Sequence, residues 1–434
     1  MNPDTTAYVQ WFRQSSPYIN AHRGKTFVIM FEGDAIAHDN FNHVVQDIAL
    51  LTSLGVRLVL VHGARPQIDA VLSKLDIQSR FHNDLRITDG EALNAVKAAV
   101  GMVKADVESR LSIGLPNSPM HGARIRVVSG NFVTAKPLGV IDGVDYQHTG
   151  EVRRIEHQAI SELLAQRNVV LLSSAGYSPS GEMFNLTVED VAQHTAVALR
   201  ADKLIIMGEQ SGLLDDDGEL IKELTCMDLE PRLQAWKGEV RCHAEAAIKS
   251  VRQGVPRVHL LSYADDGALL QELFSREGRG TMVTQYAYDQ LRNARSDDVV
   301  GILELLRPLE EQGILVRRSR ELLENEIQRF YVIERDGMIT ACAALYPYSD
   351  DKAELACVAV HADYRGTNRG QRLLEQIEQE AQRRHYKQLF VLTTRTAHWF
   401  IENGFVAGAV TELPQERQKL YNFQRNSKVF FKSL

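Results

Sequence analysis

Cysteine is scarce in this 434-residue chain, and the few cysteines form no recognisable pattern. No two of them are spaced as a CxxC pair, and no histidine–cysteine cluster has the spacing of a zinc site. A disulfide framework and a zinc centre are therefore not indicated, and we expect reduced thiols and no bound metal. The cysteines are Cys226, Cys242, Cys342 and Cys357.

Long apolar runs are also missing. The sequence contains no stretch of about 18 consecutive apolar residues, so no transmembrane helix is predicted. Residues 1–26 contain no apolar core of the kind found in secretory signal peptides. Together these absences predict a cytoplasmic protein with no membrane partner.

A basic tract is the third absence. The 49 lysines and arginines are interspersed among 56 aspartates and glutamates, and the net charge is −7. This balance argues against a nucleic-acid partner. With 44% hydrophobic and 24% charged residues, the composition is that of an ordinary soluble globular protein, and the length suggests two or three domains.

What the chain does contain is a strand, an arginine- and glycine-rich loop and a helix in direct succession near its C-terminal end. The apolar run Glu354–Val360 predicts a buried strand, and apolar residues at helical spacing over 373–381 predict a helix. Glycines in the loop let the backbone approach an anion closely, and the first helical turn presents unpaired N–H groups. The pattern predicts a pyrophosphate-binding loop, with an ordinary turn bearing surface arginines as the alternative. The predicted contacts are Arg365, Gly366, Thr367, Asn368, Arg369 and Gly370.

This segment resembles the acetyl-CoA site of the GNAT acetyltransferase family, whose motif is Arg/Gln-x-x-Gly-x-Gly/Ala. Arg365, Asn368 and Gly370 take the motif positions, so an asparagine that tolerates a left-handed backbone stands where the family usually has its middle glycine. Two later stretches, QLFVLT (388–393) and AHWFIENGFV (397–406), resemble the family's next strand and closing helix. The resemblance implies a mixed α/β acetyltransferase domain over residues 297–434, with acetyl-CoA as co-substrate.

The chemistry of such a domain needs a base, because a thioester is already activated whereas an amine is protonated at neutral pH. Glu354 starts the central strand, where acetyltransferases of this type usually hold their base, and we expect it to remove the proton. A solvated carboxylate at the strand edge is the alternative. The backbone of Cys357, Val358 and Val360 is expected to bind the pantetheine arm like an added strand.

The leaving thiolate is the second group for which we expect a proton-transfer partner. Many acetyltransferases supply a tyrosine from the closing helix, but that position corresponds to Phe400 here. We expect Thr393, at the end of the neighbouring strand, to serve instead. Thr394 is the near alternative, and a thiolate can also leave unassisted.

The first two-thirds of the chain alternates short apolar runs with helical patterns. Such alternation predicts an open, mainly parallel sheet covered by helices on both faces. A polar stretch at 286–296 is the predicted linker, so we expect domains at 1–285, with an N-terminal helix over 1–20, and at 297–434. The predicted strands are Thr26–Phe31, Val56–Gly63, Asn168–Ser174, Asp202–Gly208 and Arg257–Ser262.

The first region resembles the amino-acid kinase family, particularly acetylglutamate kinases, through stretches such as VLVHGARPQID (59–69) and SSAGYSPSGEMFNLTVEDVA (173–192). The catalytic positions differ from that family. Glu32 and Asp34 stand where kinases have a lysine and glycines, and EVRCHAEAAI (239–248) lacks their second lysine. We expect a kinase fold that has lost its chemistry, with a working kinase that uses Arg65 as the alternative.

Together, the two resemblances match the domain order of the bacterial N-acetylglutamate synthase family. Membership implies acetylation of L-glutamate by acetyl-CoA in the first step of arginine biosynthesis, arginine sensing by the kinase-like domain, and a homo-oligomer, expected to be a hexamer. An acetylglutamate kinase and a non-catalytic arginine sensor are the alternatives.

Glutamate brings two carboxylates, for which guanidinium groups are natural receptors. The resemblance points to Arg317, in a predicted strand GILVRRS (313–319), and to Arg425, with Arg318 and Lys428 as neighbouring alternatives.

For arginine as effector, the resemblance points to a helix at Tyr8–Ile19 and to the segment 272–283. Glu272, Glu277 and the backbone near Gly280 could receive a guanidinium group. The alternative is that the helix serves only as an oligomer contact.

Overall fold

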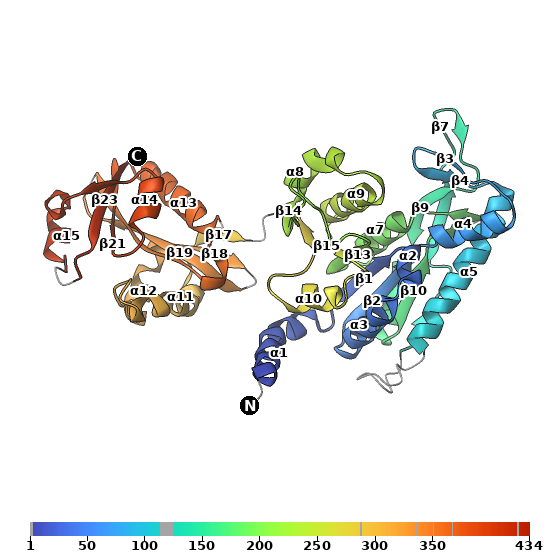
Figure 1. Cartoon of the computed structure of the whole chain (residues 1–434), viewed down its shortest axis with the longest axis horizontal. Helices are drawn as coiled ribbons and strands as arrows, with labels where there is room; N and C mark the ends of the chain where they lie inside the picture. Colours follow the sequence, from blue (N-terminus) through green and yellow to red (C-terminus); the bar gives the residue numbers. More distant parts are fainter. Residues whose placement is uncertain are drawn as a thin grey trace. The chain divides into compact units, whose positions relative to one another are not determined.

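The computed structural model divides into two compact units, residues 1–287 and 288–434, each of which is described by itself (Figure 1). It describes residues 3–112, 125–286, 289–335, 337–349, 351–366, 368–422 and 425–434. Among these residues, no helix combines the length and the apolarity needed to span a bilayer.

The first unit is built on an eight-stranded sheet in the order β14-β16-β15-β13-β1-β2-β10-β5. Neighbouring strands run parallel, except for the antiparallel pair β15 and β16. The mainly parallel sheet predicted from the sequence is confirmed. The strands are β1 (Thr26–Phe31), β2 (Arg57–His62), β5 (Val127–Val128), β10 (Val169–Ser173), β13 (Lys203–Gly208), β14 (Glu223–Thr225), β15 (Arg257–Ser262) and β16 (Thr281–Thr284).

Helices cover both faces of this sheet, which explains why its strands read as continuous apolar runs. In β1, Phe27 and Ile29 face one hydrophobic cluster, whereas Val28 and Met30 face the other, because successive strand side chains point to opposite faces. The first cluster contains residues of α2 (Gly33–Ala37), α3 (Phe41–Ser53), α4 (Arg65–Lys74), α5 (Gly90–Ser112) and α10 (Ala268–Phe274). The second contains residues of α6 (His157–Ala165), α7 (Val188–Ala198), α8 (Cys226–Leu229) and α9 (Gly238–Arg252).

Smaller elements complete the first unit. The N-terminal helix α1 (Pro3–His22) includes the predicted Tyr8–Ile19 segment, and His22 Nε2 lies 2.6 Å from the Leu273 carbonyl oxygen of α10. A 3₁₀ turn, η1 (Glu230–Ala235), precedes α9. A four-stranded sheet contains β6 (Val133–Pro137), β9 (Gly150–Ile155), β11 (Ala175–Tyr177) and β12 (Met183–Asn185). Two hairpins pair β3 (Arg80–His82) with β4 (Leu85–Ile87) and β7 (Val140–Ile141) with β8 (Val144–Asp145).

The second unit is built on a seven-stranded sheet in the order β17-β18-β19-β20-β21-β23-β22. Every neighbouring pair is antiparallel except β20 and β21, which run parallel. This is the mixed α/β architecture expected from the sequence. The strands are β17 (Gln290–Asn293), β18 (Phe330–Arg335), β19 (Met338–Pro347), β20 (Lys352–Val360), β21 (Gln388–Thr393), β22 (Val406–Gly408) and β23 (Lys428–Ser433).

Helices pack on both faces of the second sheet as well. Residues of α11 (Val299–Glu311) and α12 (Arg320–Glu326) join one hydrophobic cluster, and residues of α13 (Arg369–Arg383) and α14 (Ala397–Glu402) join the other. The short α15 (Gln415–Lys419) lies between β22 and β23 in the chain. Single turns are η2 (Ser296–Asp298), η3 (Ile327–Arg329), η4 (Ala362–Tyr364) and η5 (Val410–Glu412).

Two segments differ from the sequence-based expectation. Within the predicted linker 286–296, Gln290–Asn293 forms β17 and pairs with β18. The segment 313–319, predicted as a strand, is instead the loop between α11 and α12. Gly313 takes φ +69°, a left-handed turn typical of a helix end, and Leu315 then packs against the α11 cluster. The strand prediction was therefore wrong: Leu315 is only partly buried against the α11 cluster, and Val316 is 56% exposed.

Candidate active site

A cavity of about 530 Å³ opens in the second unit where two parallel strands separate. The pairing of β20 with β21 extends from Lys352 to Glu354 and ends there. Beyond that point Leu355–Val360 of β20 and Val391–Thr393 of β21 both line the cavity. The edge of β20 is thus available to another extended chain.

A bulge in β20 accompanies this separation. Cys342 pairs with Ala359 but Ala344 pairs with Ala356, so β20 has one more residue than β19 between the two pairs. Cys357 lies in the bulge with φ +54°, a conformation that is uncommon for residues with a side chain. A bulge bends its strand, and this one lies where β20 leaves β21.

The residues predicted to bind the pantetheine arm lie along this cavity. Cys357, Val358 and Val360 all line it, so an extended pantetheine could add to the edge of β20 as a strand would. The Cys357 thiol is a poor nucleophile, because burial raises its pKa to about 12. Its part in the site is therefore carried by its backbone.

The loop before α13 forms one end of the cavity, with Arg365, Gly366 and Gly370 in its lining. Gly366 takes φ +79°, whereas Asn368 takes φ −69° and so needs no left-handed backbone. This explains how an asparagine fits at the middle motif position. A Cβ atom on Gly370 would lie 3.4 Å from Trp399, so the cavity wall is closely packed there. Thr367 lies outside the described residues.

Arg369 is placed differently from the expectation. Its side chain is 7% exposed, with Nη2 2.7 Å from Asp289 Oδ2 and the guanidinium 4.1 Å from the Tyr364 ring centroid. Arg369 does not line the cavity in the described structure, and its charge is paired within the unit. The loop before α13 therefore presents Arg365 and the N–H groups of the first turn of α13, while Arg369 is held by Asp289.

Glu354 lies at the point where the strands part and forms a bidentate ion pair with Arg417. Arg417 Nε donates to Oε2 at 2.7 Å, and Nη2 donates to Oε1 at 3.1 Å. The two side chains are 9% and 17% exposed, respectively. Both residues line the cavity, so the predicted base is positioned beside the acyl-donor channel.

Arg425 lines the same cavity and has unused hydrogen-bonding capacity. Its Nη2 donates to the Ile314 carbonyl, but its buried Nε has no hydrogen-bond partner among the described residues. Burial, and then the nearby charges of Arg417 and Arg318, lower the pKa of Arg425 from its usual value. An anion would complete the contacts of this guanidinium.

The other predicted acceptor residue, Arg317, is exposed and absent from the described cavity lining. Its neighbour Arg318 lines the cavity instead, and its guanidinium lies 5.6 Å from the Tyr346 ring centroid. Lys428 is exposed at the start of β23. The guanidinium groups gathered near Glu354 are those of Arg318, Arg417 and Arg425.

The Thr393 hydroxyl is buried at the end of β21. Its oxygen accepts the N–H groups of Arg395 at 3.3 Å and Thr396 at 3.1 Å, and lies 2.9 Å from Thr396 Oγ1. Because the two N–H groups occupy both lone pairs, the Thr393 proton can be donated to Thr396 or to an anion in the cavity. Thr394 is exposed and lies outside the described lining, whereas Phe400 is part of it.

Several cavity residues escaped the sequence analysis, among them Arg417, Trp399 and Ser427. Arg417 lies in the polar run LPQERQKLYN (413–422), which shows no periodic pattern. Trp399 is adjacent to Phe400 and packs at 4.9 Å between ring centroids. Ser427 lies directly before β23. An excess of arginine in 417–425 was the available signal, since a dicarboxylate acceptor needs several cations.

Comparisons with known proteins agree with both halves of this description. Residues 25–262 match the amino acid kinase family, and residues 326–407 match the acetyltransferase (GNAT) domain. An amino-acid acetyltransferase from Azotobacter vinelandii is 57% identical over 432 residues, covering 98% of this chain and 99% of that protein. The chain belongs to the amino-acid acetyltransferase family.

Other relatives cover the same length. An amino-acid acetyltransferase from Pseudomonas aeruginosa is 55% identical over 429 residues, 98% of this chain and 99% of that protein. N-acetylglutamate synthase from Neisseria gonorrhoeae complexed with coenzyme A and L-arginine is 36% identical, with a TM-score of 0.89, covering 98% and 99% of the two chains. The same enzyme complexed with coenzyme A and N-acetyl-glutamate is 37% identical, with the same coverage and a TM-score of 0.64. This amino-acid acetyltransferase is thus an N-acetyltransferase that uses acetyl-CoA as co-substrate.

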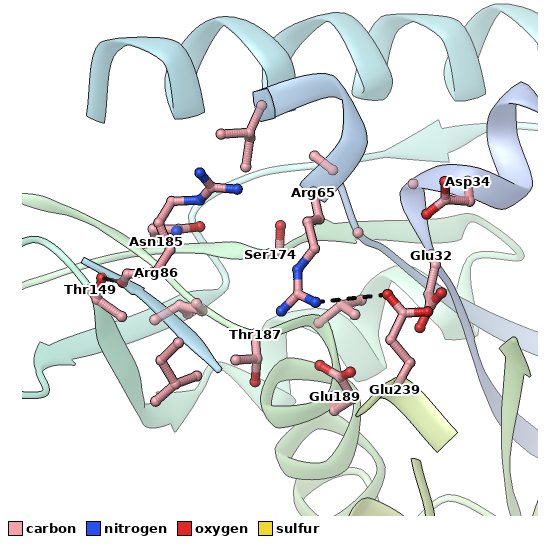
Figure 2. A pocket seen from close by; sticks show the side chains of 17 residues that line it. Glu32, Asp34, Arg65, Arg86, Thr149, Ser174, Asn185, Thr187, Glu189 and Glu239 are labelled. Atoms are coloured by element: carbon pink, nitrogen blue, oxygen red, sulfur yellow. Dashed lines mark hydrogen bonds and ion pairs between the residues drawn. The ribbon is translucent and has the colours of Figure 1, made fainter. Parts of the chain in front are cut away.

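The kinase-like unit of this amino-acid acetyltransferase has its own smaller cavity, of about 80 Å³, at the end of β1 (Figure 2). Among its cations, Arg65 lies 3.8 Å from Glu239, and Arg86 is paired with Asp69 at 2.6 Å. Burial and the charge of Glu239 raise the pKa of Asp34, as expected where negative charge is in excess. The carboxylates that line this cavity are Glu32, Asp34, Glu189 and Glu239.

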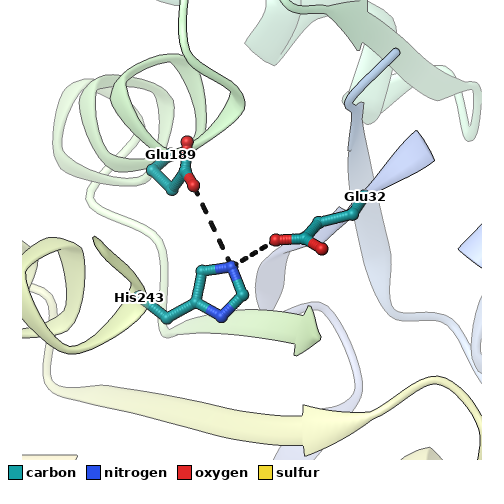
Figure 3. A group of neighbouring side chains, drawn as sticks. All are labelled: Glu32, Glu189 and His243. Atoms are coloured by element: carbon teal, nitrogen blue, oxygen red, sulfur yellow. Dashed lines mark hydrogen bonds and ion pairs between the residues drawn. The ribbon is translucent and has the colours of Figure 1, made fainter. Parts of the chain in front are cut away.

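A buried ion pair between Glu32 and His243 lies beside this cavity (Figure 3). His243 Nε2 donates to Glu32 Oε1 at 2.7 Å and lies 4.0 Å from Glu189. Burial opposes charge on the imidazole, but Glu32 and the other carboxylates raise the pKa of His243 above its usual value. Glu32 and His243 therefore neutralise each other, and this pair provides no free cation for a nucleotide phosphate.

Metal ligation is geometrically conceivable at the same place. The ligand atoms of Glu32, Glu189 and His243 lie within 4.8 Å of one another, as do those of Glu32, Asp34 and Glu239. The first group is already joined by the Glu32–His243 hydrogen bond. This pairing accounts for the cluster without an ion.

The predicted effector residues fall into two environments. Glu272 is buried on α10, where it accepts hydrogen bonds from His259 Nδ1 at 2.6 Å and from the N–H groups of Arg279 at 2.5 Å and Gly280 at 2.9 Å. Burial alone would raise the pKa of its carboxyl, but these donors hold it at about 2. Glu272 thus fixes the loop at Gly280, whereas Glu277 is exposed and lies 3.9 Å from Lys222. Of the two carboxylates, Glu277 is the one accessible to a ligand.

Proposed function

We propose that this protein makes N-acetyl-L-glutamate from acetyl-CoA and L-glutamate, the first step of arginine biosynthesis. The observation that carries the proposal is the cavity at the parting of β20 and β21, where one buried carboxylate meets three guanidinium groups. A dicarboxylate amine needs a base for its ammonium group and cations for its carboxylates. The gonococcal complexes with coenzyme A and N-acetyl-glutamate support the same assignment.

The acetyl donor is positioned by the backbone. The pyrophosphate of acetyl-CoA lies against Arg365, Gly366 and the first turn of α13, and the pantetheine arm extends along Cys357–Val360. An N–H group of this strand polarises the thioester carbonyl. No side-chain nucleophile is required, since the amine attacks the thioester directly.

The acceptor is positioned by arginines and deprotonated by Glu354. Arg425 and Arg318 bind the carboxylates, and Glu354 accepts a proton from the ammonium group directly or through one water. The freed nitrogen lone pair forms the C–N bond, and the C–S bond then breaks with its electron pair on sulfur. The thiolate takes a proton from Thr393, whose hydroxyl has both lone pairs occupied, and Thr393 is reprotonated by the second proton that the nitrogen loses as the amide forms.

Arginine regulation and assembly belong to the kinase-like unit in this proposal. The fold is well kept while the phosphate site has become acidic, which is consistent with a domain retained for binding. Glu277, α1 and the carbonyl groups near Gly280 form the proposed receptor for the guanidinium of arginine. The chain is proposed to act in the cytoplasm as a homo-oligomer, with a hexamer as the expected count.

Acceptor selectivity tests the proposal. Thiol release from acetyl-CoA is measured with L-glutamate, L-aspartate, L-glutamine and L-norvaline, and the acetylated product is identified by mass spectrometry. We expect strong preference for L-glutamate, because only this acceptor places two carboxylates at the guanidinium groups with the correct spacing. Equal rates with L-glutamine and L-glutamate would contradict the proposed substrate.

A further inference from the structure

Arg417 forms hydrogen bonds with the carboxylate of Glu354, the proposed base. Both oxygens of Glu354 accept hydrogen bonds from one guanidinium, at 2.7 and 3.1 Å. Bidentate pairs of this kind are among the strongest in proteins. A carboxylate held in this way cannot present those lone pairs to an ammonium group or to a water molecule.

Arg417 itself is held mainly by Glu354. It lies on α15, a helix of only five residues, and its other described hydrogen bond is to the Leu420 carbonyl in the same turn, at 3.4 Å. Arg425, by contrast, also donates to the Ile314 carbonyl before α12. The guanidinium of Arg417 is therefore the one that can change partner at the smallest cost in other contacts.

The charge near Glu354 favours such a change. Arg318, Arg417 and Arg425 outnumber the single carboxylate, and Arg365 and Arg395 line the same cavity. A bound dicarboxylate would supply two negative charges and offset part of this excess. Removing one member of a buried ion pair is strongly unfavourable by itself. Here Arg417 would gain a carboxylate of the acceptor, and Glu354 would gain the ammonium group of the acceptor in place of Arg417.

We propose that Arg417 is a positioning residue that keeps Glu354 blocked in the acceptor-free enzyme and releases it when a carboxylate of the acceptor takes over the guanidinium. This inference rests on the proposed function, which assigns the base to Glu354 and a dicarboxylate to the acceptor. Binding of the correct acceptor and exposure of the base thereby become one event.

The exchange also protects the thioester from water. In hydrolysis the oxygen of water bonds to the acyl carbon, the C–S bond breaks with its pair on sulfur, and the two products are acetate and coenzyme A. The water proton passes to Glu354 and then to the thiolate. Because Arg417 occupies Glu354 until an acceptor arrives, this wasteful reaction lacks its base.

The test measures acceptor-free hydrolysis in the full-length enzyme. Arg417→Gln is expected to raise thiol release without glutamate at least 10-fold and to raise the KM for glutamate at least 10-fold, with a smaller fall in kcat. For Arg417→Lys, the hydrolysis rate and the KM for glutamate should lie between those of wild type and Arg417→Gln, since lysine keeps the charge but loses the bidentate contact. Lys419→Gln, a neighbouring exposed change on α15, should behave as wild type.

The double variant Glu354→Gln/Arg417→Gln decides whether the effect passes through the base. We expect its acceptor-free hydrolysis to return to the wild-type level, whereas persistence of the raised rate would overturn the proposal. Coenzyme A affinity, measured by calorimetry, checks that each variant is folded. If Arg417→Gln fails this check, Arg417→Lys carries the test, and unchanged hydrolysis and KM in that folded variant would also overturn it.

Failure of the proposed mechanism can be distinguished from failure of the blocking role of Arg417. If Glu354→Gln alone retains turnover within a few-fold of wild type, the base is elsewhere and the proposed mechanism falls whatever Arg417 does. If Glu354→Gln is inactive but Arg417→Gln resembles wild type in hydrolysis and KM, only the blocking role of Arg417 is lost.

Discussion

The cavities of the two units differ in the sign of their charge. The kinase-like cavity places four carboxylates around Arg65. The acetyltransferase cavity places one carboxylate among Arg318, Arg417 and Arg425. The folds that carry both cavities resemble families that bind phosphate-bearing substrates, but carboxylates outnumber cations in the first cavity, whereas arginines outnumber the single carboxylate in the second. A retained fold therefore says little about retained chemistry, which depends on a few side chains at the strand ends.

The ion pair between Glu32 and His243 shows how the first cavity lost its cations. These two residues are 211 positions apart, in the two stretches that lack the kinase lysines, and form an ion pair at 2.7 Å. Glu354 and Arg417 make a pair of similar length in the second cavity. The Glu32–His243 pair lies beside a cavity in which carboxylates are in excess. The Glu354–Arg417 pair lies in a cavity in which arginines are in excess. This contrast yields four predictions.

The largest effect is expected for Glu354→Gln. Turnover should fall about 100-fold or more, the usual scale for loss of a general base, while coenzyme A binding remains near wild type. Raising the pH should partly rescue the variant, because more free amine is then present. Steady-state kinetics across pH, with calorimetry for coenzyme A, measure both. If Glu354→Gln kept wild-type turnover at neutral pH, Glu354 would not be the base, and the chemistry could not be assigned to its cavity on this ground.

Arg425→Ala is expected to act on one substrate only. The KM for glutamate should rise about 10- to 100-fold with little change for acetyl-CoA, since the side chain pairs with the acceptor. Arg369→Ala is the contrasting variant. It should lower thermal stability instead, because it removes the partner that lies 2.7 Å from Asp289. Equal changes in both KM values for Arg425→Ala would reject its assignment.

In the kinase-like unit, Glu277→Ala is expected to weaken inhibition by arginine several-fold without changing uninhibited turnover. Glu272→Ala should instead destabilise the unit, because Glu272 accepts hydrogen bonds from His259 and from the N–H of Gly280. Arginine titrations of activity, compared with thermal unfolding, separate the two outcomes. Normal inhibition in the Glu277 variant would place the effector site elsewhere.

The smallest effect is expected at His243. Since folding raises its pKa, the pair with Glu32 stabilises fully below a pH of about 6.5, and this stabilisation is lost as pH rises through the folded-state pKa. His243→Gln should flatten the pH dependence of the unfolding free energy over that range, whereas the exposed His157→Gln should not. Denaturant unfolding at several pH values measures this. Parallel curves for wild type and His243→Gln would show that the pair is not ionic.

Much of the architecture could be predicted because burial on both sheet faces leaves a plain pattern. Thr26–Phe31 and Arg257–Ser262 were predicted with the bounds that β1 and β15 have. The segment 313–319 failed because apolar residues packed against a helix look the same in sequence as those of a strand. Local pattern does not reveal which partner covers an apolar run.

The candidate site was predictable where backbone geometry dominates. Gly366 and Gly370 follow from the close approach of a chain to a phosphate, and both line the cavity. Side-chain direction was not predictable. Arg369 pairs with Asp289 from 80 positions earlier, and Arg417 reaches Glu354 across 63 positions. Such long-range pairs leave no periodic signal in a single sequence.

The central claim is that chemistry resides in the cationic cavity and not in the acidic one. One preparation of the full chain should be assayed in parallel for thiol release from acetyl-CoA with L-glutamate and for ADP release from ATP with N-acetyl-L-glutamate, each with Glu354→Gln as control. We predict glutamate-dependent thiol release that the substitution abolishes, and no ADP release above background. ADP release that depends on N-acetyl-L-glutamate, or thiol release that survives Glu354→Gln, would contradict the account.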